Sequence, residues 1–153
     1  MPVYYGCDLP EDLHFDVERD VWVRYEPDGT ATLGMTDVSQ TRCGKVVNMM
    51  FKKVGKVINQ GGAAATVESG KWIGPFPMPF SGEIVETNEA TFIRDILIMN
   101  KDPYGRGWLV KVRPSDPNEP NNLLQGDAAF EAYKQRINDL EVRCLRCVDE
   151  SMD

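Results

Sequence analysis

Short runs of β-forming residues, separated by turn residues, dominate the chain between residues 21 and 114. In VWVRYEPDGTATLGM, residues 21–35, two such runs flank a turn at Pro27, Asp28 and Gly29. Further strands are expected at residues 45–51, 63–69, 72–76, 82–87 and 107–112, the last of the series. Short strands at this spacing favour a small antiparallel barrel or sandwich. We therefore predict a mainly β fold.

Helical signals are few. Thr36 is expected to cap a short helix over residues 37–43, and Gly44 to end it. Residues 88–100 suggest one or two short helical turns. Three prolines within residues 75–79 exclude a central strand there. A central strand forms hydrogen bonds with a neighbour on each side, and proline has no amide hydrogen to donate.

The C-terminal part has a helical period instead. Its apolar positions are Phe130, Tyr133, Ile137, Leu140 and Cys144. We expect an amphipathic helix over residues 127–144, packed on the β domain. The expected organisation is an irregular N-terminal segment (1–20), a β domain (21–114), and a linker with the terminal helix (115–153).

Composition limits the possible partners. The chain has 153 residues, enough for one domain with its own core, and a net charge of −7. That charge argues against a nucleic-acid partner and against an anionic membrane surface. No apolar run is long enough to span a bilayer, and the N-terminus lacks a signal-peptide pattern. We expect a cytoplasmic monomer whose four cysteines are thiols.

The usual catalytic and metal-binding patterns are missing from the sequence. His14 is the one histidine, so a multi-histidine metal site is excluded and a Ser/His/Asp arrangement is disfavoured. ATVESGKW resembles a phosphate-binding loop but has Ala65 for the first glycine and Trp72 for the hydroxyl residue. We expect no catalytic residue, no metal site and no nucleotide site.

Two cysteines, Cys144 and Cys147, have the spacing of a redox pair in CLRC. Redox pairs lie at helix N-termini, where the dipole lowers the thiol pKa, whereas this pair lies at the end of the expected helix. Two small buried apolar side chains are therefore favoured over a redox or metal pair. The spacing suggests no partner for Cys7 or Cys43.

One lysine, Lys71, lies at the bend between two expected strands, in ESGKW. A bend exposes its side chain, and Gly70 permits a tight backbone there. This position alone does not separate an ordinary surface charge from a lysine displayed for modification.

Four segments resemble the lipoyl-bearing H protein of the glycine cleavage system. They are TATLGMTDVSQ, TVESGKW, FSGEIVETNEA and MNKDPYGRGWLVKV, and the similarity runs from about Val21 to Pro114 with a weaker echo at residues 123–133. The family's attachment motif, Glu-Ser-Val-Lys-Ala, reads Glu68-Ser69-Gly70-Lys71-Trp72 in this chain. The family's glycines sixteen residues before and eleven after the lysine match Gly55 and Gly82.

This resemblance implies a flattened barrel-sandwich hybrid with Lys71 at a hairpin tip and lipoate covalently attached to it. Glu68, Ser69, Gly70 and Trp72 would form the attachment motif, and Gly55 and Gly82 would be structural glycines. Such a protein is a carrier that visits partner enzymes on a swinging arm and is not itself an enzyme. The two thiols of the reduced lipoate would supply reversible disulfide chemistry. The acidic surface of the protein suits basic pockets on its partners.

Several features depart from the typical family pattern. RDVWV lacks the family's histidine, NMMFKKVG adds Lys52 and Lys53, Trp72 follows the lysine, and the tail RCLRC is extended. These features resemble the H-like lipoate-binding proteins of sulfur-oxidising prokaryotes. That resemblance implies an arm that binds sulfur intermediates for a cytoplasmic heterodisulfide-reductase-like complex, together with lipoylating enzymes as partners. The alternatives are an H protein that shuttles aminomethyl between glycine cleavage enzymes, and an unlipoylated structural or regulatory module.

Overall fold

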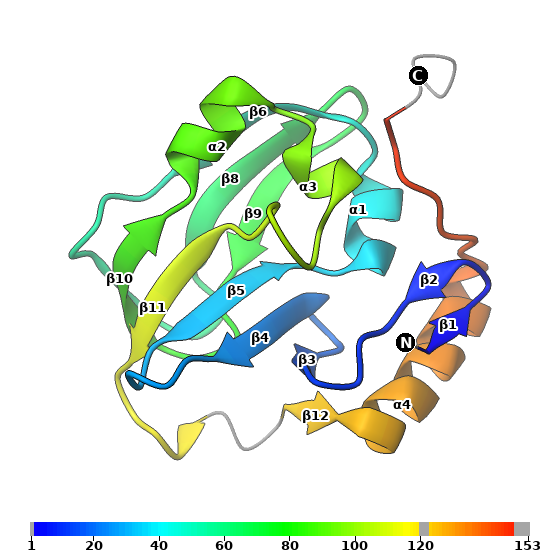
Figure 1. The fold of residues 1–153 in the computed structure, drawn as a ribbon, viewed down its shortest axis with the longest axis horizontal. Helices are drawn as coiled ribbons and strands as arrows, with labels where there is room; N and C mark the ends of the chain where they lie inside the picture. The colour runs from blue at the N-terminus through cyan, green and yellow to red at the C-terminus, as the bar shows by residue number, and fades with distance from the viewer. Residues whose placement is uncertain (1, 120–122, 149–153) are drawn as a thin grey trace.

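The computed structural model describes residues 2–119 and 123–148 and is a mainly β fold (Figure 1). Its largest sheet has seven antiparallel strands in the order β12-β3-β4-β5-β11-β10-β7. These strands are β3 (His14–Asp16), β4 (Val21–Tyr25), β5 (Ala31–Met35), β7 (Val57–Ile58), β10 (Gly82–Thr87), β11 (Val110–Pro114) and β12 (Leu124–Gln125). The second sheet, β6-β8-β9, consists of β6 (Val46–Phe51), β8 (Ala63–Ser69) and β9 (Ile73–Pro77).

The two large sheets enclose the main core. Val23 and Leu33 from the first sheet and Val67 and Phe76 from the second belong to one buried cluster. Fully burying a side chain of this size contributes roughly 1.5–3 kcal/mol relative to leaving it exposed, so the facing sheets hold each other in place. The predicted barrel-sandwich fold is confirmed.

Most of the expected strands are present with bounds close to those predicted. The hairpin over residues 21–35 forms β4 and β5, and Gly29 at its turn has a φ of 87°. The proline-rich β9 is an edge strand of its sheet, as proline requires. Two expectations were wrong. Residues 1–20 contain β3 and a small hairpin of β1 (Val3–Tyr4) and β2 (Cys7–Asp8), and β11 is followed by one more strand, β12.

The short helices lie where the sequence predicts them. They are α1 (Asp37–Cys43), α2 (Glu89–Arg94) and α3 (Ile98–Lys101). At the start of α1 the Thr36 side chain accepts a hydrogen bond from the Ser39 amide, and at its end Gly44 has a φ of 84°. A residue with a side chain is strained in that conformation, so glycine suits this helix end.

The terminal helix α4 (Gly126–Leu140) packs on a second buried cluster. Ala129, Tyr133 and Ile137 belong to this cluster together with Phe15 and Trp22 of the large sheet, and the rings of Tyr133 and Phe15 meet edge to face. The expected apolar stripe is therefore real, but it ends earlier than predicted. Glu141 takes a left-handed conformation that closes α4, so Cys144 lies beyond the helix.

The expectation that all four cysteines are thiols was wrong. Cys144 is joined to Cys7 by a disulfide, whereas Cys43 and Cys147 are free and buried. No local pattern could predict this pairing, because the two residues are 137 positions apart. The bond fastens the chain after α4 to the N-terminal hairpin, which Figure 1 shows side by side with α4. Within the described ranges, no helix is long and apolar enough to cross a membrane.

Candidate functional site

Lys71 lies at the tip of the β8–β9 hairpin. The Ser69 amide donates a hydrogen bond of 2.7 Å to the Trp72 carbonyl, which leaves Gly70 and Lys71 as the two residues of the turn. Lys71 is exposed and Gly70 has open space around its Cα. The turn therefore presents the lysine at the end of a strand pair that is fixed below it.

Two further contacts hold the tip in place. The Ser69 hydroxyl donates to the Trp72 carbonyl at 3.2 Å and accepts from the Lys71 amide at 3.3 Å. The Gly70 amide donates to the Lys45 carbonyl, just before β6, at 3.3 Å. Because hydrogen bonds on both sides fix the backbone of the turn, movement at this tip belongs to the Lys71 side chain.

The stem of Lys71 lies against the end of α1. A Cβ at Gly44 would come within 2.8 Å of Lys71 Cε, so the absence of a side chain at Gly44 makes room for the lysine. Beside it opens a groove of about 570 Å³, which we call the tail groove. Its lining residues are Thr41, Gly44, Lys45, Val47, Gly70, Lys71, Leu145 and Cys147.

A buried polar network places both walls of the tail groove. The Asn100 amide group donates to Gln40 Oε1 at 3.1 Å and to the Gly44 carbonyl at 2.9 Å. Gln40 Nε2 in turn donates to the Leu145 carbonyl at 2.6 Å, and Gln40 Oε1 accepts from the Cys147 amide. Buried polar side chains are costly unless paired, so this network specifies one arrangement of α1 and the tail. Gln40 and Asn100 were not predicted as site residues, because neither stands in a sequence motif.

The two free thiols stand close to the lysine. Burial raises the pKa of the Cys43 thiol, while the Ser69 hydroxyl and the Lys71 charge act in the opposite direction. Burial likewise raises the pKa of the Cys147 thiol. Both are therefore neutral thiols at pH 7 and poor nucleophiles. The prediction that Cys147 is a small buried side chain is confirmed, and the same prediction for Cys144 is replaced by the disulfide.

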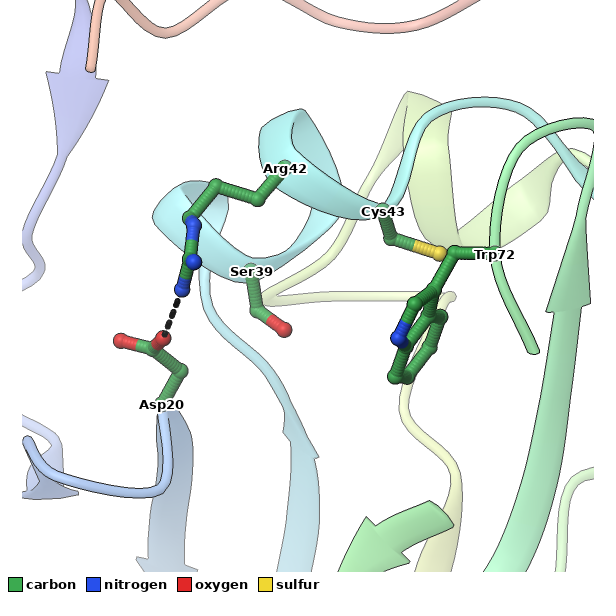
Figure 2. A pocket seen from close by; sticks show the side chains of 5 residues that line it. All are labelled: Asp20, Ser39, Arg42, Cys43 and Trp72. Carbon is green, nitrogen blue, oxygen red and sulfur yellow. Dashed lines mark ion pairs between the residues drawn. The ribbon is translucent and has the colours of Figure 1, made fainter. Parts of the chain in front are cut away.

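A second, smaller pocket is bounded by Trp72, the residue that follows Lys71 (Figure 2). Its volume is about 200 Å³, and its lining residues are Asp20, Ser39, Arg42, Cys43 and Trp72. We call it the arginine pocket. Trp72 was predicted as part of the attachment motif, whereas no motif or spacing in the sequence predicts that Arg42 lines the same pocket.

The remaining predicted site residues fall into two places. Glu68 is the second-to-last residue of β8, half-buried, and pairs in register with Asn48 and Ile73. Gly55 and Gly82 lie in the turn between β6 and β7 and at the start of β10, and the Gly55 amide donates to the Ile84 carbonyl at 2.7 Å. These two glycines shape the scaffold and line neither pocket.

Other chemistry is not supported. In the parts of the chain that the structure describes, no group of three His, Cys, Asp or Glu side chains could hold a metal ion. His14 packs edge-on against Tyr25 with ring centroids 5.0 Å apart, and burial lowers its pKa. It lies in β3, which neither pocket includes.

Comparisons with known proteins agree on one family. The family model described as glycine cleavage H-protein matches residues 13–136. A relative from Aquifex aeolicus (strain VF5), glycine cleavage system H protein 3, is 44% identical over 95% of this chain and 92% of its own. A probable glycine cleavage system H protein 2 from Saccharolobus solfataricus is 42% identical over 95% and 99%.

A solved structure has the same fold. It is a glycine cleavage system H protein from Mycobacterium marinum, with a TM-score of 0.71 and 31% sequence identity. The match covers 84% of this chain and 98% of that one.

Proposed function

The chain belongs to the glycine cleavage H-protein family, and from that premise we propose that it carries lipoate on Lys71 and works as a swinging-arm carrier between partner enzymes. The single observation that supports this most directly is the position of Lys71, exposed at the tip of a hairpin whose backbone is fixed on both sides. The carrier needs no catalytic residue of its own.

The surroundings of Lys71 fit such a group. Amide formation at Nζ removes the charge of the lysine, and the tail groove beside its stem is lined by Val47 and Leu145, which suit an apolar chain. When bound, lipoate supplies reversible thiol–disulfide chemistry and two thiols that can hold a cargo. The residues that fix or flank the turn are Glu68, Ser69, Gly70 and Trp72. We propose that a lipoylating enzyme recognises them.

The cargo that the comparisons favour is the aminomethyl group of glycine cleavage, because the relatives are named as H proteins of that system. The partners would then be the glycine cleavage enzymes. The net charge of −7 would favour docking to basic partner surfaces. We also propose a cytoplasmic location, in which the Cys7–Cys144 bond would have to be maintained against reducing conditions.

A second cargo, a sulfur group handed to a heterodisulfide-reductase-like complex, is favoured by a specific observation. Two guanidinium groups and one carboxylate meet beside the hairpin tip, at Arg42, Arg136 and Asp20. This excess of positive charge opposes a cationic aminomethyl group and suits an anion. The sulfur role remains a proposal that the family membership does not itself imply.

Mass spectrometry of the protein from its native host tests the carrier function. We expect the intact mass to include one lipoyl group and the peptide containing Lys71 to carry it. A Lys71→Arg variant, which keeps the charge but cannot be lipoylated, is the matched control and should show no addition. Native protein that is consistently unmodified at Lys71 would refute the proposal.

A further inference from the structure

Charge is distributed unevenly along the chain. Residues 44–81, which contain β6 to β9, have five lysines and one carboxylate, a formal charge of +4. The remaining residues have twelve lysines and arginines and twenty-three carboxylates, a formal charge of −11. Lys71 therefore lies in a basic part of a molecule that is acidic elsewhere. The net charge of −7 describes the other surfaces of the protein and not the surroundings of this lysine.

One face of the β6–β8–β9 sheet is exposed and largely apolar. Alternation along the strands turns Met49 and Val67 into the core and leaves their neighbours on the opposite face. That face has two cross-strand rows, Asn48–Glu68–Ile73 and Met50–Thr66–Pro75. Val47, Met50 and Ile73 are between 48% and 60% exposed. Apolar side chains gathered in this way are typical of a surface that another protein covers.

Lysines stand at both ends of this face. β6 begins beside the hairpin tip, where Lys45 and Lys71 lie. It ends in the β6–β7 loop, which contains Lys52, Lys53 and Lys56 and lies at the opposite end of the sheet (Figure 1). The length of β6 separates the two groups by roughly 20 Å. We call the apolar rows together with these five lysines the lysine face.

The loop lysines are presented from a fixed backbone. The Lys56 amide donates to the Lys53 carbonyl at 3.2 Å, and the Ile84 amide donates to the Lys56 carbonyl at 2.9 Å. The Gly55 amide donates to the Ile84 carbonyl at 2.7 Å. Among the described residues, Lys52, Lys53 and Lys56 form no ion pair. A partner can therefore pair with them without first ordering the loop or displacing a carboxylate.

The enzyme that modifies Lys71 has to contact this face. It must bring a reacting carbonyl group to Lys71 Nζ, and this requires contact with the hairpin tip. Enzymes that act later meet the far end of a long arm, so they can work without touching the sheet. The tip continues directly into the apolar rows, because Ile73 is the second residue after Lys71.

We propose that the lysine face is the docking surface for the enzyme that attaches lipoate to Lys71, and that this enzyme has an apolar patch bordered by carboxylates. The inference rests on the proposed carrier function and names the chemistry of one partner. An apolar centre with a charged rim is the usual composition of such an interface. Nucleic acids and anionic membranes fit less well, because their charge extends beyond this face and meets the −11 of the remaining residues.

The test measures the lipoylation kinetics of the full chain with the lipoylating enzyme of the native host. In this reaction Nζ attacks the carbonyl of an activated lipoate and an amide bond forms. The bond to the activating group breaks, and Nζ releases two protons. Intact-mass spectrometry follows the product while the activated lipoate is in excess. Initial rates at several concentrations of the acceptor protein give KM and kcat separately.

We expect Lys52→Gln with Lys53→Gln to raise KM by about fivefold and to leave kcat within about twofold, because two exposed charges at the interface rim are lost. The difference should shrink as the salt concentration rises from about 0.05 M to about 0.5 M, since salt screens exposed charges. The matched control is Arg106→Gln with Arg113→Gln, two exposed arginines outside residues 44–81. Its KM should stay within about twofold, and equal KM values for the two double variants would overturn the inference.

Ile73→Thr tests the apolar rows independently of charge. It should raise KM by about threefold at every salt concentration, because part of an apolar side chain is lost from the interface. Ile93→Thr is the matched control, since Ile93 is 78% exposed on α2, outside the lysine face. Urea denaturation checks that both variants fold. If both substitutions raise KM equally, the apolar rows are not the contact surface.

Two further outcomes distinguish this inference from the carrier function. Native protein without lipoate on Lys71 would refute the carrier function. Lipoylated native protein whose lysine variants have an unchanged KM would refute the docking surface alone. Vesicles of phosphatidylglycerol and phosphatidylcholine are the control for a lipid partner. If the unmodified sequence sediments with them and the Lys52→Gln, Lys53→Gln variant does not, the lysines bind a membrane and the inference is wrong.

Discussion

The three glycines named in the sequence motif, Gly55, Gly70 and Gly82, differ in what their backbone positions require. Gly55 has a φ of 95°, in the left-handed region that side chains disfavour, with open space around it. Gly82 has an ordinary φ, but a Cβ there would come within 2.9 Å of the Arg113 carbonyl oxygen. Gly70 has neither restriction. The first two are required by the backbone, and the third is not.

Alanine substitutions should separate these roles. Gly55→Ala should lower the free energy of unfolding by roughly 1 kcal/mol or more, since the native φ becomes strained. Gly82→Ala should also destabilise, because a backbone oxygen cannot move aside as a flexible side chain does. Gly70→Ala is the matched control and should leave stability unchanged. Urea denaturation measures all three, and equal stability of the Gly55 and Gly70 variants would contradict this account.

At the scale of elements, α4 is held by its buried face and not by its length. Tyr133 and Ile137 are fully buried in the cluster that includes Phe15 and Trp22, whereas Leu140 is 37% exposed. Arg136 on the same helix pairs with Asp20 of the arginine pocket. The helix therefore supports the site as well as covering the sheet.

Truncating side chains along α4 should reveal this gradient. Ile137→Ala should cost roughly 2–5 kcal/mol, because it removes buried methyl groups and leaves a cavity. Leu140→Ala should cost clearly less, since much of that side chain already faces water. Both are measured by chemical denaturation. Equal costs at the two positions would mean that the helix does not pack through the face described.

At the scale of the whole molecule, the tail after α4 joins the two ends of the chain. The Cys144 amide donates to the Tyr5 carbonyl at 3.0 Å, and Arg146 pairs with Asp8 at 2.6 Å. The Cys7–Cys144 bond reinforces these contacts. The same tail supplies Leu145 and Cys147 to the wall of the tail groove beside Lys71. The tail therefore contains both the Cys144 end of the disulfide and part of the groove wall.

Removing the bond should weaken the fold. A Cys7→Ser, Cys144→Ser double variant should lose roughly 2–5 kcal/mol, because the link constrains a long loop in the unfolded chain. Dithiothreitol should lower the unfolding midpoint of the unmodified sequence toward that of the variant and leave the variant unchanged. Cys147→Ser is the control, because that thiol is free and the variant keeps the Cys7–Cys144 bond. The unfolding midpoint of this variant should still fall on reduction. A reductant effect of the same size on the double variant would contradict this.

Local patterns in the sequence determined much of the fold. β-forming runs bounded by turn residues predicted the hairpin at residues 21–35 and the strands on either side of Lys71. The Thr36 cap and the Gly44 end of α1 were predictable because capping depends on neighbours in sequence. The resemblance that singles out Lys71 also rests on a contiguous motif, and the structure places that residue at a hairpin tip.

Tertiary structure alone decided the contacts between distant residues. The pairing of Cys7 with Cys144 depends on how α4 packs, and four cysteines in a sequence leave the connectivity open. Arg42 and Trp72 meet because α1 ends beside the hairpin tip, held there by Asn100, and no spacing encodes that meeting. Sequence periodicity describes which face of an element is apolar, whereas the geometry of a pocket depends on which elements pack together.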